Sequence, residues 1–316
     1  MASNGSEPEG CVPTATPFTL SDSGRNIAAG DIAIDPQAHH DDRDMPVVSC
    51  LMVTRDRPAM AARAIECFLA QSYPNRELVV IDGGGSDELQ QGIDALCYPP
   101  VKIYAERQAN RSMGELRNLA VEKSSGRYLC IWDDDDLYDP DRLSIQMSSI
   151  RFLGADACFL ARLQLWWPAR RIFAVSIRRM WEGSLVCARE KFPPYRHLHR
   201  GEDIAIGYRL WRSRRVVMLD APRLYTYVFH GANTTGETQF SQHCDAATEQ
   251  FAGDAYDRQL AVLGTRVPTD TDPLAPPNEK EPTDVPAGDS VNFPYRDVAG
   301  ARPQRDASGA GAPRPT

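Results

Sequence analysis

Four consecutive aspartates, Asp133 to Asp136, directly follow the apolar run 128–132. Adjacent carboxylates repel one another and cannot all be buried without partners. At the end of a buried strand, such a run suits a divalent cation that takes one or two carboxylates from the protein and its other ligands from phosphate oxygens. The alternative is a solvated acidic turn before the helix that follows Pro140. We favour a metal and phosphate site because of the position after a strand.

A second polar loop begins at Asp82 and continues with three glycines, after the apolar run 78–81. Glycine lets the backbone approach a ligand closely, although a plain strand-to-helix turn would use the same residues. The chain contains neither G-x-G-x-x-G nor G-x-x-x-x-G-K-[ST]. The sequence therefore does not support a dinucleotide-binding fingerprint or a P-loop nucleotidase.

Two further signals lie in the second half of the chain. Glu202 and Asp203 precede an apolar helical pattern, and an acidic pair at this place also suits a plain helix N-terminus. His230 ends the alternating run 225–229. A lone histidine of this kind is more often structural than metal-ligating, so both readings of His230 stay open.

These side chains need elements that present them together. Buried strands are predicted from the apolar runs over 47–53, 78–81, 101–104 and 128–132. Helical patterns follow Pro58 and Pro140 and cover 113–123. Alternation of strands and helices predicts an α/β fold with a mostly parallel, doubly wound sheet. Ligands of such sheets bind at the carboxyl ends of the strands, where the acidic run and the Asp82 loop lie.

Composition narrows the class of protein. The 316 residues carry a net charge of -8, with a pI near 5.3, which argues against nucleic acid as a partner. The eight cysteines form no C-x-x-C pair, which favours reduced, buried thiols in a cytosolic protein. No window of 18 apolar residues and no secretory leader pattern is present. We expect a cytoplasmic protein, with peripheral contact to the inner face of a membrane left open.

Charge and proline content divide the chain into three parts. Residues 1–45 hold eight acids against two arginines, which predicts a disordered acidic arm. Ten of the 24 prolines lie in 268–316, which predicts a disordered tail over 265–316. The single folded domain is then expected over 46–264.

Five short motifs, in this order, resemble the nucleotide-sugar half of family-2 glycosyltransferases. They are Val47–Val53 with Thr54-Arg55-Asp56-Arg57-Pro58, Ala70-Gln71-Ser72-Tyr73-Pro74, Glu77–Asp82, Arg117-Asn118 and Trp132–Arg142. The resemblance covers about 47–145 and continues more loosely over about 146–240. It implies the GT-A fold, with a donor half over 46–145 and an acceptor half over 146–264.

The resemblance also assigns roles on the donor side. The residues implied to contact the nucleotide-sugar are Thr54, Arg55, Asp56, Asp82, Arg117, Asp134 and Asp135. Asp134 and Asp136 match the family's D-x-D motif, and with His230 they are the implied ligands of Mn²⁺ or Mg²⁺. Many members carry a second acid after the one that matches Asp82, whereas this chain has Gly83, so the base of the donor stays open.

On the acceptor side, Asp203 matches the family's general base, and Glu202 would orient the base or the acceptor. Trp181, Gly183 and Ser184 are implied to border the acceptor. A weakly acidic hydroxyl needs such a base, and a leaving diphosphate needs a cation. A single displacement of this kind inverts the anomeric centre.

Residues 151–200 carry nine arginines and one lysine against three acids, a net charge of +7. Scattered, solvated arginines are one explanation. The excess also fits an anionic acceptor, such as a lipid-linked diphosphate sugar, or an anionic membrane surface.

The sequence thus predicts a metal-dependent, inverting glycosyltransferase that uses a UDP-sugar and a hydroxyl acceptor in polysaccharide or cell-envelope glycan synthesis. The Q-x-x-R-W signature of processive synthases is absent, so a non-processive enzyme is expected. One alternative is a catalytically idle GT-A protein that binds nucleotides or acts as a scaffold. A nucleotidyltransferase is less favoured, because the loop 54–58 has no glycine.

Overall fold

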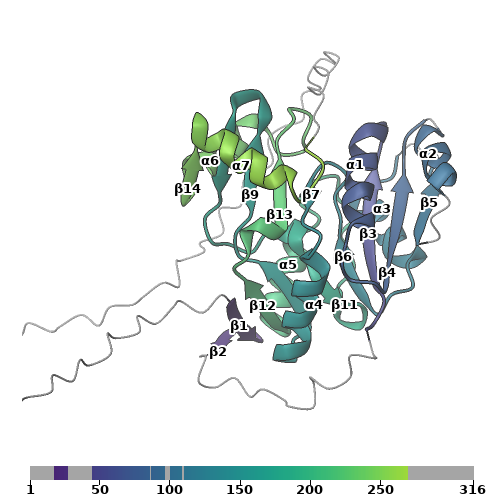
Figure 1. Cartoon of the computed structure of the whole chain (residues 1–316). Helices are drawn as coiled ribbons and strands as arrows, with labels where there is room; N and C mark the ends of the chain where they lie inside the picture. Colours follow the sequence, from purple (N-terminus) through teal and green to yellow (C-terminus); the bar gives the residue numbers. More distant parts are fainter. Residues whose placement is uncertain (1–17, 28–44, 86, 97–99, 109, 270–316) are drawn as a thin grey trace, which may run out of the picture. The chain divides into compact units, whose positions relative to one another are not determined.

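The computed structural model describes residues 18–27, 45–85, 87–96, 100–108 and 110–269 (Figure 1). These residues form two sheets. The nine-stranded sheet has the order β2 (Arg25–Ile27), β1 (Phe18–Asp22), β12 (Arg215–Leu219), β8 (Ala157–Leu160), β11 (Val186–Ala188), β6 (Tyr128–Ile131), β3 (Val48–Thr54), β4 (Arg76–Asp82), β5 (Val101–Ala105). The five-stranded sheet has the order β14 (Glu249–Phe251), β10 (Ile172–Val175), β9 (Gln164–Trp167), β13 (Tyr225–Val228), β7 (Leu137–Tyr138). The helices are α1 (Pro58–Leu69), α2 (Glu88–Leu96), α3 (Met113–Lys123), α4 (Arg142–Leu153), α5 (Ile204–Ser213), α6 (Glu237–Asp245) and α7 (Asp254–Gly264).

Helices cover both faces of the large sheet, which confirms the predicted α/β class. Because side chains alternate along a strand, Cys50 and Met52 of β3 join the core cluster that contains the buried residues of α1 and α4. Leu51 faces the other way and packs with Leu116 and Ala120 of α3. Figure 1 shows α1 and α2 beside the β3–β5 end of the sheet.

The prediction of a mostly parallel sheet is correct for one part only. β6, β3, β4 and β5 are mutually parallel, and β8 pairs in parallel with β12. Between these groups, β11 runs antiparallel to both β6 and β8. This strand was not predicted, because β11 has only three residues and lacks the long apolar run that marked the parallel strands.

The expected disordered arm over 1–45 is wrong for residues 18–27. Here β1 and β2 form a hairpin, and β1 pairs along its whole length with β12. Leu20 is 1% exposed, and the turn at Ser23 and Gly24 has positive φ at both residues. The alternating pattern over 18–22 was missed because it is short and the region 1–45 as a whole is rich in acids. The other residues of the arm before Met45 lie outside the described residues, as does the tail from Asp270 on.

The start of the expected tail also packs on the domain. Val267 is buried in the main core cluster. Arg266 donates two hydrogen bonds to the buried Asp139, each 2.8 Å long. The folded part therefore continues past the predicted end at residue 264.

The carboxylate of Glu77, in β4, is hydrogen-bonded to three other segments of the chain. It accepts hydrogen bonds from Ser49 Oγ (2.7 Å), Lys102 Nζ (2.7 Å) and the Ser125 backbone N–H (2.6 Å). Burial opposes ionisation, yet these donors outweigh it and lower the pKa of Glu77 from 4.5 to about 2. A depressed carboxyl pKa stabilises the fold above the unfolded-state pKa and loses this effect as pH falls through the folded-state value.

Replacing Glu77 by glutamine should lower the free energy of unfolding at pH 7 by about 2 kcal/mol, because hydrogen bonds to a charged group are lost. The difference from wild type should shrink as pH falls from 4.5 towards about 2, where the wild-type carboxylate is protonated. Urea unfolding between pH 2.5 and 7 measures it. Glu122→Gln, at a side chain 70% exposed, is the matched control and should change little. A Glu77→Gln deficit that does not vary with pH would contradict this account.

Candidate active site

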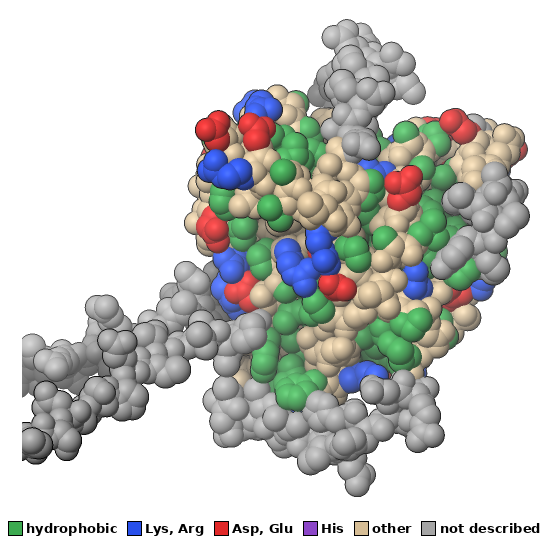
Figure 2. Space-filling model, in the orientation of Figure 1, with side chains coloured by type: hydrophobic (Ala, Val, Ile, Leu, Met, Phe, Trp, Pro, Cys, Tyr) green, Lys and Arg blue, Asp and Glu red, His purple; other side chains and the backbone are tan. Residues whose placement is uncertain are grey.

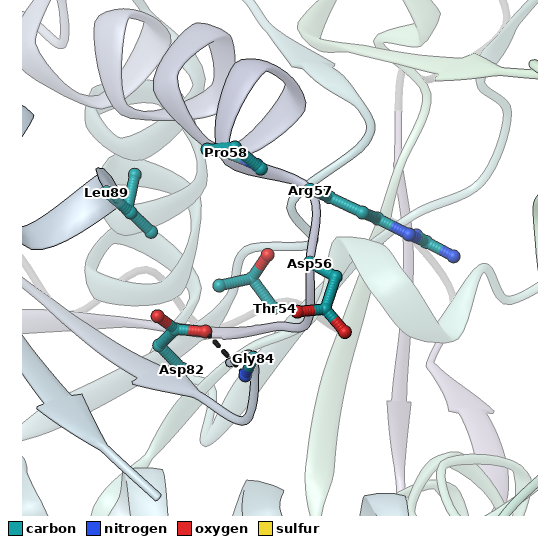
Figure 3. A pocket seen from close by; sticks show the side chains of 7 residues that line it. All are labelled: Thr54, Asp56, Arg57, Pro58, Asp82, Gly84 and Leu89. Carbon is teal, nitrogen blue, oxygen red and sulfur yellow. Dashed lines mark hydrogen bonds between the residues drawn. The ribbon is translucent and has the colours of Figure 1, made fainter. Parts of the chain in front are cut away.

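The carboxyl ends of β3 and β4 border a cleft. Thr54 and Asp82 are direct partners in the parallel register, so both reach this edge of the sheet. The empty space between the lining residues of the cleft is about 210 Å³, a figure that includes open solvent. Figure 3 shows its lining residues, Thr54, Asp56, Arg57, Pro58, Asp82, Gly84 and Leu89.

Two aspartates hold the loops that border this cleft. Asp56 has a φ of 52°, and its Oδ1 accepts a hydrogen bond of 2.9 Å from the Gly85 N–H. Asp82 Oδ1 accepts a hydrogen bond of 2.8 Å from the Gly84 N–H. A non-glycine residue in the left-handed region is uncommon and is held there by its surroundings. The hydrogen bond between Asp56 and Gly85 therefore joins the loop after β3 to the loop after β4.

Gly83, where the resemblance would place a second acid, lies beside the side chain of Arg55. A Cβ at this position would lie 3.2 Å from Arg55 Nε and 3.3 Å from its Nη2. The Arg55 guanidinium thus covers the place where a second acid would stand. Arg55 is otherwise exposed and does not line the cleft.

The four aspartates alternate in direction. Asp134 and Asp136 are buried, and Thr54 Oγ1 donates a bond of 2.6 Å to Asp134 Oδ2. Asp136 accepts from the Tyr225 hydroxyl (2.5 Å) and from the Val228 N–H (2.8 Å). These two carboxylates fix the turn between β6 and β7 against β3 and β13.

The other two carboxylates are the accessible ones. The side chains of Asp133 and Asp135 are 27% and 14% exposed. Asp135 Oδ2 lies 3.0 Å from His230 Nε2 and 3.2 Å from Arg57 Nη1. Asp133 Oδ1 accepts a hydrogen bond of 2.9 Å from Arg117 Nη2.

These surroundings separate the pKa values of the run. Burial, with repulsion from Asp135, raises the pKa of Asp134 to about 7 and that of Asp136 well above its usual value. Burial also opposes ionisation of Asp135, but the contacts with His230 and Arg57 lower its pKa. Asp135 is therefore the carboxylate of this group that is best able to stay charged.

Asp136, a predicted metal ligand, accepts one hydrogen bond at each of its oxygens, so a bound cation would have to share these oxygens with Tyr225 and Val228. Among the described residues, no three His, Cys, Asp or Glu side chains gather in a way that could hold a metal. Asp135 and His230 are adjacent, but both ring nitrogens of His230 are engaged, by Asp135 Oδ2 (3.0 Å) and by the Ala232 N–H (3.3 Å), so a cation here would have to replace the contact between His230 and Asp135. A two-donor set fits a Mg²⁺ or Mn²⁺ ion that takes its remaining ligands from phosphate oxygens and water.

Arg117 joins the acidic run to the acceptor half of the chain. Its Nε donates a bond of 2.9 Å to Glu202 Oε1, while its Nη2 contacts Asp133. Glu202 is 4% exposed, and burial raises its pKa. Asp203 is half-buried and stands at the N-cap of α5 without a side-chain cap bond. The cap alone therefore does not explain the presence of an acid at 203.

Of the three residues expected to border the acceptor, Gly183 alone lies against the acidic run. A Cβ there would stand 3.0 Å from the Tyr225 hydroxyl and 3.1 Å from Asp133 Oδ2. Ser184 is fully buried, and its hydroxyl donates to the Trp181 carbonyl and accepts from the Leu160 N–H. Trp181 is 6% exposed, with Arg179 over its ring. Ser184 and Trp181 therefore support the loop from within and offer a ligand little surface.

Arg142, the first residue of α4, makes buried contacts with segments next to the acidic run. It is fully buried, and its guanidinium lies within about 5 Å of the ring centres of Trp132, Tyr138 and Tyr225. Its Nη2 donates to the carbonyl oxygens of Ile131 (3.1 Å) and Gly183 (3.3 Å). One cation thus holds both the strand before the acidic run and the loop that faces it.

We expect Arg142→Met to lower the free energy of unfolding by about 3 kcal/mol or more, because it leaves buried carbonyl groups without a donor. Arg142→Lys should recover part of this loss. Urea unfolding measures both variants. A methionine variant as stable as wild type would show that the cation does not hold this region together.

Several site residues were missed from the sequence. Asp133, within the acidic run, was given no role of its own, and neither were Arg57 and Tyr225, which contact the run. Arg57 could have been found, since it lies in the loop directly after the first predicted strand. That Asp133 and Asp135 are less buried than Asp134 and Asp136 could not have been predicted, since it depends on the direction of the turn.

The sequence and the fold of this chain are similar to those of known proteins. Residues 49–179 match the family described as "Glycosyl transferase family 2". This segment belongs to glycosyltransferase family 2. The family-2 segment includes the strand-end loops and the acidic run, while Glu202, Asp203 and His230 lie beyond it.

Two curated relatives are similar to part of this chain. The "Putative colanic acid biosynthesis glycosyl transferase WcaA" of Escherichia coli is 34% identical over 105 residues, which are 33% of this chain and 37% of the relative. The "Succinoglycan biosynthesis protein ExoO" of Rhizobium meliloti is 32% identical over 111 residues, 35% of this chain and 32% of that protein. The chain thus spans less than half the length of these relatives.

Among solved structures, Staphylococcus aureus TarS 1-349 in complex with UDP-GlcNAc has a similar fold. It aligns with a TM-score of 0.50 and 15% identity, over 61% of this chain and 60% of that one. This likeness confirms the GT-A type of fold. Within the described residues, the chain has no helix with the length and apolar character needed to cross a membrane.

Proposed function

We propose that this chain is a glycosyltransferase that moves a sugar from a nucleotide-diphospho-sugar, with UDP as the nucleotide, to a hydroxyl acceptor. The observation that carries the proposal is the double contact of Arg117 with Asp133 and Glu202. It places the acidic run of the donor half next to the acidic pair of the acceptor half. Biosynthesis of polysaccharides by the two named relatives supports a glycan product.

The donor would lie along the carboxyl edge of β3 and β4. Asp82 and Asp56 would border the base and ribose, and Arg57 and Arg117 would face the diphosphate. Asp135 and His230 would hold a Mn²⁺ or Mg²⁺ ion, which supplies positive charge against the leaving diphosphate. Arg57, beside Asp135, would contribute a second positive charge at the same place.

Asp203 is the proposed general base. It would take the proton of the acceptor hydroxyl as that oxygen attacks the anomeric carbon, and the bond to the diphosphate breaks. Glu202, held by Arg117, would orient the acceptor. Attack from the side opposite to the leaving group gives inversion in a single step.

Donor hydrolysis tests this proposal without knowledge of the acceptor. UDP-, GDP-, CMP- and dTDP-sugars are incubated with the full chain and Mn²⁺, and release of the free nucleotide is followed. Metal-dependent release from UDP-sugars is expected. Absence of release from every donor, with a folded protein, would favour an idle scaffold with the same fold.

A further inference from the structure

Exposed apolar side chains gather on one short segment of the chain. In the described residues, six large hydrophobic side chains are exposed, and three of them, Leu198, Ile204 and Tyr208, fall within eleven positions. They are 42%, 46% and 45% exposed. Scattered exposed residues need no explanation, but such a group does.

The helix α5 has one face in the core and the opposite face exposed. Ile206 and Leu210 face inward and join a core cluster with Phe159 and Val216. Ile204 and Tyr208 are four positions apart and share the opposite face of the helix. Tyr208 accepts a hydrogen bond from Arg212, which is the next residue in this row.

The preceding loop is held in place by backbone contacts. The Gly114 N–H donates a bond of 3.0 Å to the Leu198 carbonyl. A Cβ at Gly114 would lie 1.7 Å from the Arg196 carbonyl oxygen, so only glycine permits this approach. Gly201, with a φ of 70°, then turns the chain into Glu202. The exposure of Leu198 is therefore a feature of a fixed loop.

The segment that carries these residues is also basic in sequence. Residues 196–214 contain five arginines against Glu202 and Asp203, five minus two or +3, and two histidines. Several basic side chains on the face in Figure 2 lie beside acidic ones, and Arg170 and Arg171 pair with Glu237 and Asp257. By contrast, within the described part of the chain Arg196, Arg200 and Arg209 have no acidic group within 4.0 Å.

We propose that residues 196–201 and the exposed face of α5, here called the basic apolar surface, bind the surface of an anionic lipid bilayer. Leu198, Ile204 and Tyr208 would enter the interface between headgroups and acyl chains, and the arginines would contact lipid phosphates. A free anion would match the arginines but not the exposed apolar side chains. If the proposed function holds, Asp203, which precedes Ile204, then faces acceptors carried by that bilayer.

Vesicle sedimentation with the full chain tests this proposal directly. Binding to vesicles of phosphatidylcholine with 30% phosphatidylglycerol is compared with binding to phosphatidylcholine alone. Wild type should bind the anionic vesicles at least about tenfold more tightly. Arg209→Gln with Arg212→Gln should weaken this binding by about 10- to 30-fold, since each arginine near such a surface adds about one kcal/mol. Leu198→Ser with Tyr208→Ser should weaken it by about tenfold or more.

The matched control is Val262→Ser with Arg127→Gln, which changes one exposed apolar and one exposed basic residue on other elements. It should bind like wild type, and circular dichroism checks that all variants are folded. Equal binding to both vesicle types, or no binding, would overturn the proposal. So would loss of binding in 10 mM inorganic phosphate at constant ionic strength, or a change of oligomeric state in the surface variants. None of these outcomes depends on transferase activity.

Discussion

Asp203→Asn should reduce sugar transfer by about 10²- to 10⁴-fold, the usual range for loss of a general base. The amide keeps the shape of the side chain but cannot take the proton of the acceptor hydroxyl. Donor binding should stay unchanged, because the proposed donor contacts lie on β3, β4, α3 and the acidic run and not on α5. Initial rates at saturating donor and calorimetry of nucleotide binding measure the two effects separately.

Asp254→Asn is the control for a merely structural effect. Asp254 also lies in the first turn of a helix, α7, but remote in sequence from the acidic pair. It should transfer sugar at the wild-type rate. Turnover near wild type in Asp203→Asn would remove Asp203 from the mechanism and leave it as a residue at the start of α5.

Asp135→Ala and Asp136→Ala should fail in different ways. Asp135→Ala should weaken metal-dependent nucleotide binding by at least about 10²-fold, because it removes the charged carboxylate of the two-donor set. It should also lose some stability, because the buried His230 loses its partner. Asp136→Ala should lower the free energy of unfolding by about 2–4 kcal/mol, since the buried Tyr225 hydroxyl and Val228 N–H lose their acceptor.

Calorimetry with Mn²⁺ and urea unfolding separate these two variants. A stable Asp136→Ala protein that no longer binds nucleotide would restore Asp136 as the ligand. An Asp135→Ala protein with wild-type, metal-dependent affinity would contradict the role given to Asp135 here.

Local signals were sufficient for much of the fold. The helix predicted over 113–123 is observed as α3 with those bounds, and a capping box between Ser112 and Glu115 explains its start. Pro58 is the first residue of α1, as its fixed φ favours. By contrast, β11 and the hairpin of β1 and β2 are short strands that depend on partners far along the chain, which no local window contains.

In the candidate site, too, some features were predicted from local sequence and others were not. Its position after β6 followed from the sequence, because acids at the end of an apolar run mark the edge of a sheet. The direction of each carboxylate did not follow, since it is set by Thr54 and Tyr225, which lie 80 and 89 positions from the aspartates they bind. The resemblance implied the pair Asp134 and Asp136, which are buried, whereas Asp133 and Asp135 are the less buried pair of the run, at 27% and 14% side-chain exposure.

Calorimetric titration with UDP, GDP, CMP and dTDP, each with and without Mn²⁺, tests the central claim most directly. The claim is that the cleft at β3 and β4 and the pair of Asp135 and His230 together form a nucleotide-diphosphate site. Binding of UDP that requires Mn²⁺, with much weaker binding of the other three, is the predicted result. No binding of any nucleotide in the presence of Mn²⁺ would contradict the claim, and the acidic run would then be only a structural turn.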